Sequence, residues 1–205
     1  RMIGAYNVAN LLGVLAAMRG LGVPLQAAVQ ACGSLHPVPG RMECLGRAGE
    51  PLVAVDYAHT PDALSHALAA LRPLAAQRGG RLWCVFGCGG DRDASKRPLM
   101  GAIACQNADQ VVVTSDNPRS EKAESIIAHI LLGLAHSKAV DVQSNRALAI
   151  ADTVARAAAN DVILVAGKGH EQTQEIAGVK HVFSDREHAQ QALRSRRLQN
   201  TEVRT

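Results

Sequence analysis

Two short runs of apolar residues near the middle of the chain are each followed by a loop rich in Gly, Asp, Asn and Arg. Residues 82–86 and 111–114 have the length and composition of buried strands. A helix is expected between them from Pro98 to Ala104, because proline is tolerated in the first turn of a helix. Loops that follow parallel strands lie at one edge of the sheet, where ligands bind. We therefore expect the polar residues of both loops to converge on one crevice, namely Asp91, Arg92, Asp93, Asp116, Asn117 and Arg119.

Apolar and polar segments continue to alternate along the rest of the chain. Some helices have clear start signals, such as Thr60 as an N-cap followed by Pro61, or Ser120 as the cap of a later helix. The expected helices cover residues 7–20, 24–32, 61–76, 120–135 and 146–158, with one more at the C-terminus. The expected strands cover residues 52–56, 140–142 and 162–166, with hairpins at 41–56 and 175–183. This alternation predicts an α/β fold, a Rossmann-like and mostly parallel sheet with helices on both faces.

A stiff segment, HPVPG at residues 36–40, separates the first two helices from the rest of the chain. Its two prolines exclude regular structure, so it is the best candidate for a domain boundary. We therefore expect one unit at residues 1–40 and a second at 41–205. The chain begins without methionine, in what reads as the middle of a domain, and we expect it to be a fragment of a longer protein.

Composition and charge narrow the possible partners. Hydrophobic residues make up 47% of the chain, which is enough to build a core, whereas aromatic residues make up only 2%. The net charge of +4 favours anionic small molecules. Scattered basic residues and few aromatics disfavour nucleic acid, and the one basic cluster, Arg194 to Arg197, is interpreted as a solvated helix end. No uninterrupted run of 18 apolar residues is present, so no membrane partner is expected.

Five cysteines, an odd number without a paired pattern, are typical of reduced thiols in the cytosol. Cys84 and Cys88 do not make a metal motif, because no second pair follows and Cys84 falls within a predicted strand. We expect no metal ligands in this chain.

Four polar loops follow the predicted strands: DYAHTP, GCGGDRD, SDNPR and GKGHE. GCGGDRD is not a dinucleotide fingerprint, because Arg92 stands where a glycine is required, and GKGHE lacks the spacing of a phosphate loop. His59 and His170, taken alone, are more typical of surface or capping residues. Taken together, however, two arginines, several carboxylates and two glycine turns at one edge suit a zwitterion with an additional carboxylate.

Six segments also carry a family resemblance: GAYNVANLLGVLAA, PGRME, DYAHTPDAL, FGCGGDRDASKRPLMG, TSDNPRSE and AGKGHE. In this order and spacing they resemble the Mur ligases, and the resemblance covers nearly the whole chain. It implies an ATP-dependent amide ligase of peptidoglycan synthesis in the bacterial cytoplasm, in which ATP phosphorylates a carboxylate and an amine attacks the acyl phosphate. It further implies that residues 1–40 are the tail of the central ATP-binding domain and residues 41–205 the C-terminal domain.

The resemblance also implies roles for individual residues. On the ATP side it places Asn7, Asn10, Arg41, Asp56 and His59. The incoming amino acid would be bound by Arg92, Asp116, Asn117, Pro118, Arg119, Gly167 and Glu171. No catalytic residue is assigned within this chain. The G-K-[ST] phosphate loop of the family is absent, so we expect the ligands of Mg²⁺ upstream and the chain alone to be inactive.

Two amino acids are candidates for the one that is added, meso-diaminopimelate and lysine. Within the family, the order of motifs resembles the tripeptide-forming members, which add meso-diaminopimelate or lysine to UDP-N-acetylmuramoyl-L-alanyl-D-glutamate. A lysine pocket should be acidic, whereas this edge offers Arg92 and Arg119, and DNPR resembles the diaminopimelate type. We therefore predict meso-diaminopimelate. A lysine-adding ligase and a non-catalytic binding module remain the competing hypotheses.

Overall fold

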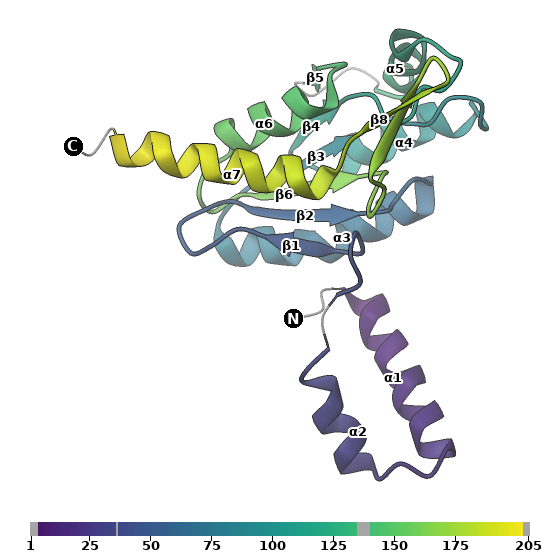
Figure 1. The fold of residues 1–205 in the computed structure, drawn as a ribbon, viewed down its shortest axis with the longest axis vertical. Helices are drawn as coiled ribbons and strands as arrows, with labels where there is room; N and C mark the ends of the chain where they lie inside the picture. Colours follow the sequence, from purple (N-terminus) through teal and green to yellow (C-terminus); the bar gives the residue numbers. More distant parts are fainter. Residues whose placement is uncertain (1–3, 36, 135–139, 203–205) are drawn as a thin grey trace.

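A central six-stranded sheet organises the structure, a computed structural model that describes residues 4–35, 37–134 and 140–202 (Figure 1). The strands are β1 (Glu43–Leu45), β2 (Leu52–Asp56), β3 (Leu82–Phe86), β4 (Gln110–Val113), β5 (Val140–Val142) and β6 (Val162–Ala166), with a separate hairpin of β7 (Thr173–Ile176) and β8 (Val179–Val182). The helices are α1 (Ala5–Gly20), α2 (Leu25–Cys32), α3 (Pro61–Arg78), α4 (Lys96–Asn107), α5 (Ala123–Leu131), α6 (Arg146–Arg156) and α7 (Asp185–Glu202).

The strand order is β1-β2-β6-β3-β4-β5, and only the edge strand β1 runs antiparallel to its neighbour. All five residues of β3 and all five of β6 are buried, because helices cover both faces of the sheet. Alternate strand residues point to the two faces, so Cys84 packs with α3, α4 and α5, whereas Trp83 and Val85 pack with α6 and α7. The predicted α/β fold, with its mostly parallel sheet covered on both faces, is confirmed.

One predicted helix start is wrong. The helix expected to begin at Ser120 begins at Ala123, with Lys122 at its N-cap position. The Ser120 hydroxyl instead donates a hydrogen bond to the carboxylate of Asp91, which ties the residue to the loop after β3. Its predicted end near Ala135 lies outside the described residues. The helix predicted from Pro98 is also longer than expected, since α4 already begins at Lys96.

The first two helices form a pair that lies apart from the sheet (Figure 1). Many of their apolar side chains are exposed, including Val8, Leu12 and Leu25. The proline-rich segment follows, and the structure describes it from Pro37 on. Its last residue, Gly40, packs closely against the backbone of the GKGHE loop. Gly40 adopts a φ of +68°, and a Cβ atom at this position would collide with the backbone of Gly169 and His170. The end of the predicted linker is therefore anchored on the GKGHE loop, whereas the domain boundary itself stays a prediction.

Among the described residues, no helix is long and apolar enough to cross a membrane.

Candidate functional site

The four polar loops meet at the carboxyl ends of β2, β3, β4 and β6, where they line a pocket of about 310 Å³. This arrangement follows from the parallel order of these strands, which places all four strand ends at one edge. The charged side chains that line the pocket are three cations, Arg92, Lys96 and Arg119, and three carboxylates, Asp93, Asp116 and Glu171. The pocket is thus balanced in charge, as a zwitterionic ligand requires.

The pocket contains most of the side chains that were expected to hold an amino acid. Six of those seven residues line it, namely Arg92, Asp116, Asn117, Arg119, Gly167 and Glu171. Pro118 does not line it; its carbonyl group accepts a hydrogen bond from the backbone N–H of Glu121. The expected convergence of the two central loops is therefore confirmed as geometry, except for Asp91, which is exposed and bonded to Ser120.

The residues expected on the ATP side are spread over a larger region. His59 lines the pocket, and the Arg41 guanidinium lies over the ring of Tyr57, 4.9 Å from its centre. Asp56 is buried, and its carboxylate accepts hydrogen bonds from the backbone N–H groups of Met42 and Ala58. Burial raises the pKa of the Asp56 carboxyl, although these two hydrogen bonds and Arg41 oppose the rise. Asn7 and Asn10 lie on α1, outside the pocket lining.

An ion pair that sequence reasoning missed joins the two central loops. Arg97, which is 1% exposed, donates to both carboxylate oxygens of Glu121 at 2.8 and 2.9 Å. The same guanidinium donates to the carbonyl oxygen of Gly89, and the Glu121 carboxylate accepts from the backbone N–H of Asp91. The hydrogen bond from Arg97 lowers the pKa of Glu121, which keeps the pair charged. Arg97 and Glu121 therefore fix the GCGGDRD loop against the DNPR loop.

Arg119 is held in an unusual backbone conformation. Its φ is +54°, which an L-residue other than glycine adopts at a cost of about 1–2 kcal/mol. The backbone of the β7–β8 hairpin stabilises this conformation, because the N–H of Arg119 donates to the carbonyl of Glu175 and its own carbonyl accepts from the N–H of Ala177. Its guanidinium Nη1 donates to the carbonyl oxygen of Gly90 at 2.6 Å, which aims the side chain along the pocket wall. Strain of this kind is typical of sites where a side chain must be positioned.

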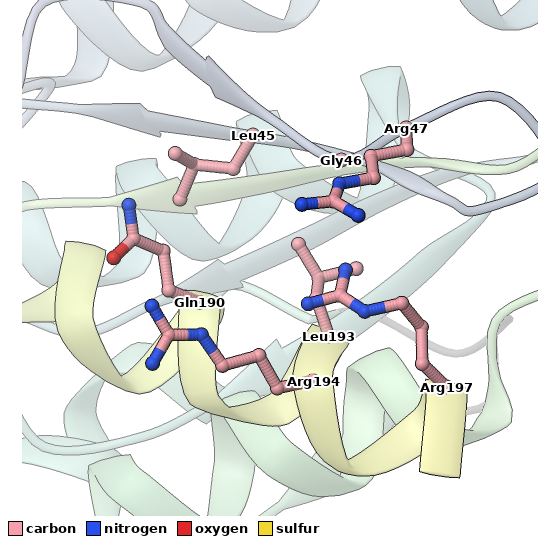
Figure 2. Close-up of a pocket in the computed structure, with 7 residues that line it drawn as sticks. All are labelled: Leu45, Gly46, Arg47, Gln190, Leu193, Arg194 and Arg197. Carbon is pink, nitrogen blue, oxygen red and sulfur yellow. The ribbon is translucent and has the colours of Figure 1, made fainter.

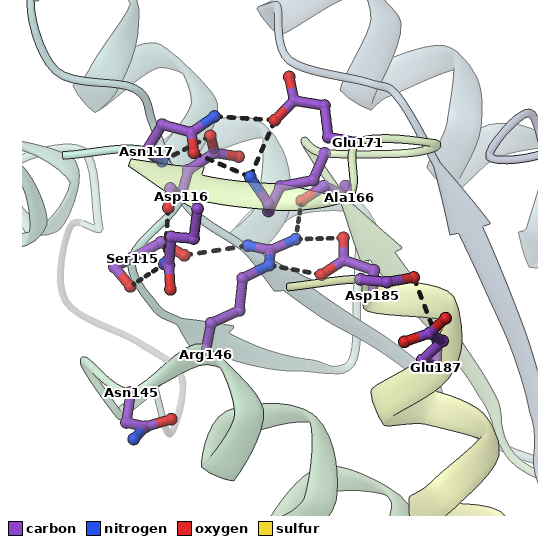
Figure 3. A network of polar contacts seen from close by, with 12 residues as sticks. Ser115, Asp116, Asn117, Asn145, Arg146, Ala166, Glu171, Asp185 and Glu187 are labelled. Atoms are coloured by element: carbon purple, nitrogen blue, oxygen red, sulfur yellow. Dashed lines mark hydrogen bonds and ion pairs between the residues drawn. The ribbon is translucent and has the colours of Figure 1, made fainter. Parts of the chain in front are cut away.

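A buried lysine holds two residues of the pocket lining, Asn117 and Glu171, which are labelled in Figure 3. Lys168 is 0% exposed, and its Nζ donates to Asn117 Oδ1 at 2.9 Å and to Glu171 Oε2 at 2.8 Å. Asn117 Nδ2 donates to the same Glu171 oxygen at 2.8 Å. These three residues come from two loops, so the network orients the polar ends of both. The sequence indicated the GKGHE loop, but nothing in it distinguished a buried lysine from the exposed one that is usual.

An ion pair in which both side chains are buried lies next to this network (Figure 3). Arg146 forms a bidentate salt bridge with Asp185, in which both donor–acceptor distances are 2.7 Å. Both side chains are 0% exposed. The same guanidinium donates to the carbonyl oxygens of Ser115 and Ala166, which end the segments leading into two of the loops. Arg146 therefore links the segment after β4 and the end of β6 to the start of α7.

Asp116 and Glu171 are two pocket carboxyls with opposite electrostatic environments. Burial raises the pKa of Asp116, and the nearby cations Arg146 and Lys168 only partly oppose it. Burial also acts to raise the pKa of Glu171, but hydrogen bonds from Lys168 and Asn117, together with the charges of Lys168 and Arg119, outweigh it, and the net shift is downward. Asp116 also approaches the backbone closely, because a Cβ atom at Gly167, where φ is +120°, would collide with its carboxylate. Only glycine fits there.

A cluster of three or more His, Cys, Asp or Glu side chains that could hold a metal ion is absent from the described part of the chain. The pocket also combines cations with carboxylates, which fits an amino acid better than a triphosphate with its metal. The described residues therefore do not by themselves fit a complete ATP–Mg²⁺ site.

Fold and pocket together define an α/β domain with a charged pocket at the carboxyl edge of a mostly parallel sheet. A family profile with the description "Mur ligase, glutamate ligase domain" matches residues 40–169, and the chain belongs to this family.

Named relatives and solved structures agree with this assignment. The chain is 66% identical over 196 residues to the UDP-N-acetylmuramoyl-L-alanyl-D-glutamate--2,6-diaminopimelate ligase of Acidovorax sp. (strain JS42), covering 96% of this chain and 39% of the relative. The ligase of the same name from Ralstonia nicotianae is 54% identical, with 95% and 38% covered. A solved structure of a ligase with this name matches with a TM-score of 0.75 and 42% identity, over 96% of this chain and 40% of that one.

A more distant structure, the UDP-N-acetylmuramate-alanine ligase of Thermotoga maritima, shares the fold with a TM-score of 0.67 and 21% identity over 97% of this chain and 39% of that one. The chain spans about 39% of the length of the curated relatives it matches.

Proposed function

We propose that this chain is the amino-acid-binding part of an ATP-dependent ligase that adds meso-diaminopimelate to UDP-N-acetylmuramoyl-L-alanyl-D-glutamate in peptidoglycan synthesis. The observation that carries the proposal is the pocket at the carboxyl edge of the sheet, with three cations and three carboxylates. The relatives named as 2,6-diaminopimelate ligases support it, because they match nearly the whole chain.

The charge pattern of the pocket suits the distal end of diaminopimelate. That end carries an ammonium and a carboxylate on one carbon, whereas lysine carries only the ammonium. Arg92 and Arg119 offer forked donors for the carboxylate, and Asp116 or Glu171 accepts from the ammonium. Asn117 and Lys168 hold Glu171 in place for this contact. The recognition of both groups at once is what separates the two amino acids.

The bound amino acid would react through the amine at its other end. The nitrogen lone pair forms the new C–N bond to the acyl phosphate, the C–O bond to the phosphate breaks, and the amine loses a proton. ATP supplies the phosphoryl group that activates the carboxylate. The role of this chain is to bind and orient the amine, and we assign no proton acceptor among its residues.

The same proposal assigns residues 1–40 to the tail of a central ATP-binding domain and residues 41–205 to the C-terminal domain. The exposed apolar side chains of α1 and α2 support this division, because they require a partner that the sheet does not provide. We place the contacts to ATP at Asn7, Asn10, Arg41, Asp56 and His59, and the ligands of Mg²⁺ outside this chain. The protein would act in the bacterial cytoplasm on small molecules, without a nucleic-acid or membrane partner.

A comparison of two amino acids in the full-length protein tests the proposal. We expect kcat/KM for meso-diaminopimelate to exceed that for lysine by up to about 10⁴-fold, because lysine leaves the arginines without an anion. Arg119→Ala should lower kcat/KM for diaminopimelate by about 10²-fold and leave that for lysine almost unchanged, since lysine has no distal carboxylate. Arg81→Ala, at an exposed arginine just before β3, is the matched control and should change neither value.

The selectivity readout separates recognition from a structural role. If Arg119 only supported the loop through Gly90, its removal would lower the activity with both amino acids equally. Comparable use of lysine by the unmutated protein would support the lysine-adding alternative, and the absence of any ligase activity in the full-length protein would support a binding module.

A further inference from the structure

A second pocket, about 200 Å³ in volume, lies at the amino end of β2, opposite the edge that holds the candidate site. It is formed between the turn that joins β1 to β2 and one side of α7 (Figure 2). The turn contributes Leu45, Gly46 and Arg47, and the helix contributes Gln190, Leu193, Arg194 and Arg197. Two of these residues belong to the basic cluster that the sequence had indicated as a solvated helix end. We call this cavity the arginine pocket.

The arginine pocket has an excess of positive charge. Three guanidinium groups line it, and its lining contains neither aspartate nor glutamate. Glu50 forms an ion pair with Arg197 at 2.9 Å, but Glu50 is only 7% exposed and its other oxygen already accepts from the backbone N–H of Arg47. Among the described residues, no ion pair is formed by the side chain of Arg47 or of Arg194. Among the described side chains, therefore, two arginine charges face one cavity without an ion-pair partner.

The positions of these side chains indicate the kind of anion that would bind. Arg47 and Arg197 extend into the cavity from opposite walls, and Arg194 lies farther along it beside Gln190 (Figure 2). A guanidinium presents two parallel N–H donors, which match the oxygens of a phosphate or a carboxylate. One carboxylate occupies one such fork, whereas two linked anionic groups can use forks at both ends of the cavity. Two apolar side chains, Leu45 and the buried Leu193, also line the cavity.

We propose that the arginine pocket binds a small molecule that carries a pyrophosphate or two neighbouring phosphate groups. The concave shape and the volume of about 200 Å³ favour a small ligand over an extended surface of lipid or nucleic acid. Bound phosphates would supply the counter-charge that Arg47 and Arg194 lack. The site is separate from the candidate amino-acid site, so the proposal does not depend on the ligase function.

Equilibrium dialysis with radiolabelled inorganic pyrophosphate tests this proposal on the full-length protein. We expect the double variant Arg47→Ala, Arg194→Ala to bind one equivalent less than the unmutated protein, because any other pyrophosphate site is common to both. Arg81→Ala, which removes an exposed arginine elsewhere, should bind the same number of equivalents as the unmutated protein. The double variant Arg47→Lys, Arg194→Lys keeps the charges but loses the forks, and should weaken the site by about tenfold. The fluorescence of Trp83, the single tryptophan, verifies that each variant is folded.

Competition experiments then identify the ligand class. Orthophosphate should displace pyrophosphate from this site only at a concentration about tenfold higher or more, since it fills one fork instead of two. An unchanged number of bound equivalents in the Arg47→Ala, Arg194→Ala variant would overturn the proposal. Displacement by citrate at the same concentration as unlabelled pyrophosphate would overturn the assignment to phosphates, because the site would then accept any polyanion.

Discussion

The part of the chain that contains the sheet, residues 41–134 and 140–202 (called the sheet domain below), and the helix pair, residues 4–35, use similar apolar residues with opposite results. In the sheet domain the apolar side chains of β3 and β6 are fully or almost fully buried, and even charged groups such as Arg146 and Asp185 are enclosed. In the helix pair Leu12 is 61% exposed, and Ala28 is the one buried residue among its described side chains. Burying a leucine is worth about 1.5–3 kcal/mol, so the helix pair forgoes most of the stabilisation that its sequence could provide.

This difference teaches that an apolar pattern predicts a helix but not the partner that covers it. The helix pair has helical spacing, a glycine stop and a second helix, yet among the described residues many of its apolar side chains stay exposed. The sheet domain, by contrast, contains both layers that cover its strands. Substitutions in the two regions should therefore have very different costs, and these costs can be measured.

The largest loss of stability is expected from a substitution in the buried ion pair of the sheet domain, Arg146 and Asp185. Arg146→Ala leaves Asp185 buried without a partner and frees the carbonyls of Ser115 and Ala166, so it should lower the free energy of unfolding by about 3–5 kcal/mol. Urea denaturation followed by the fluorescence of Trp83, which lies in β3, measures this change.

A second arginine serves as the control for this measurement. Arg72→Ala removes a partly exposed ion pair with Asp109, in which the side chains are 41% and 38% exposed, and should cost less than about 1 kcal/mol. Equal costs for the two substitutions would contradict the structural role of the buried pair.

A smaller loss of stability is expected when one leucine in each region, Leu68 in the sheet domain or Leu12 in the helix pair, is replaced by alanine. Leu68→Ala in α3 removes a side chain that is 0% exposed and should cost about 2–5 kcal/mol. Leu12→Ala in α1 removes an exposed side chain and should change the stability of this chain by less than about 0.5 kcal/mol. In the full-length protein, however, the cost of Leu12→Ala should rise if the proposed central domain covers α1. A Leu12→Ala cost near that of Leu68→Ala in this chain alone would break the comparison.

The sequence predicted the features that depend on local pattern. Apolar runs indicated β3 and β6, and the polar loops after parallel strands indicated that one edge would hold Arg92, Asp116 and Glu171. These predictions hold because strand direction alone decides where the loops emerge.

What the sequence did not predict depends on contacts between distant segments. Ser120 has the character of a helix cap but binds Asp91, which is 29 residues away. Arg146 and Asp185 are separated by 39 residues, and nothing near either one indicates a buried pair. The burial of Lys168 follows from Asn117 on another loop, 51 residues away. Charged residues of this kind are usually exposed, so only the assembled fold identifies the exceptions.

The smallest change in the free energy of unfolding should come from substituting the two pocket carboxyls, Asp116 and Glu171. The two substitutions should change it in opposite directions. Because burial raises the pKa of Asp116, the folded protein binds a proton there more tightly than the unfolded chain. Stability from this group is therefore fully present below the ordinary pKa of aspartate and falls as the pH rises through the raised value. At neutral pH the buried, ionised carboxylate destabilises the fold. Asp116→Asn should therefore stabilise the protein by about 0.5–2 kcal/mol, the usual size of a single stabilising substitution.

Glu171 provides the opposite case, because its net shift is downward. Its contribution to stability is present above the ordinary pKa of glutamate and is lost as the pH falls through the lowered value. Glu171→Gln should therefore destabilise the protein at neutral pH, where it also removes the charge that Lys168 faces at 2.8 Å. Urea denaturation of both variants from pH 3 to pH 8 measures these differences, and both should shrink toward the acidic end. Shifts of the same sign at neutral pH would show that burial alone, and not the hydrogen bonds from Lys168 and Asn117, determines the cost of a carboxylate at this edge of the sheet.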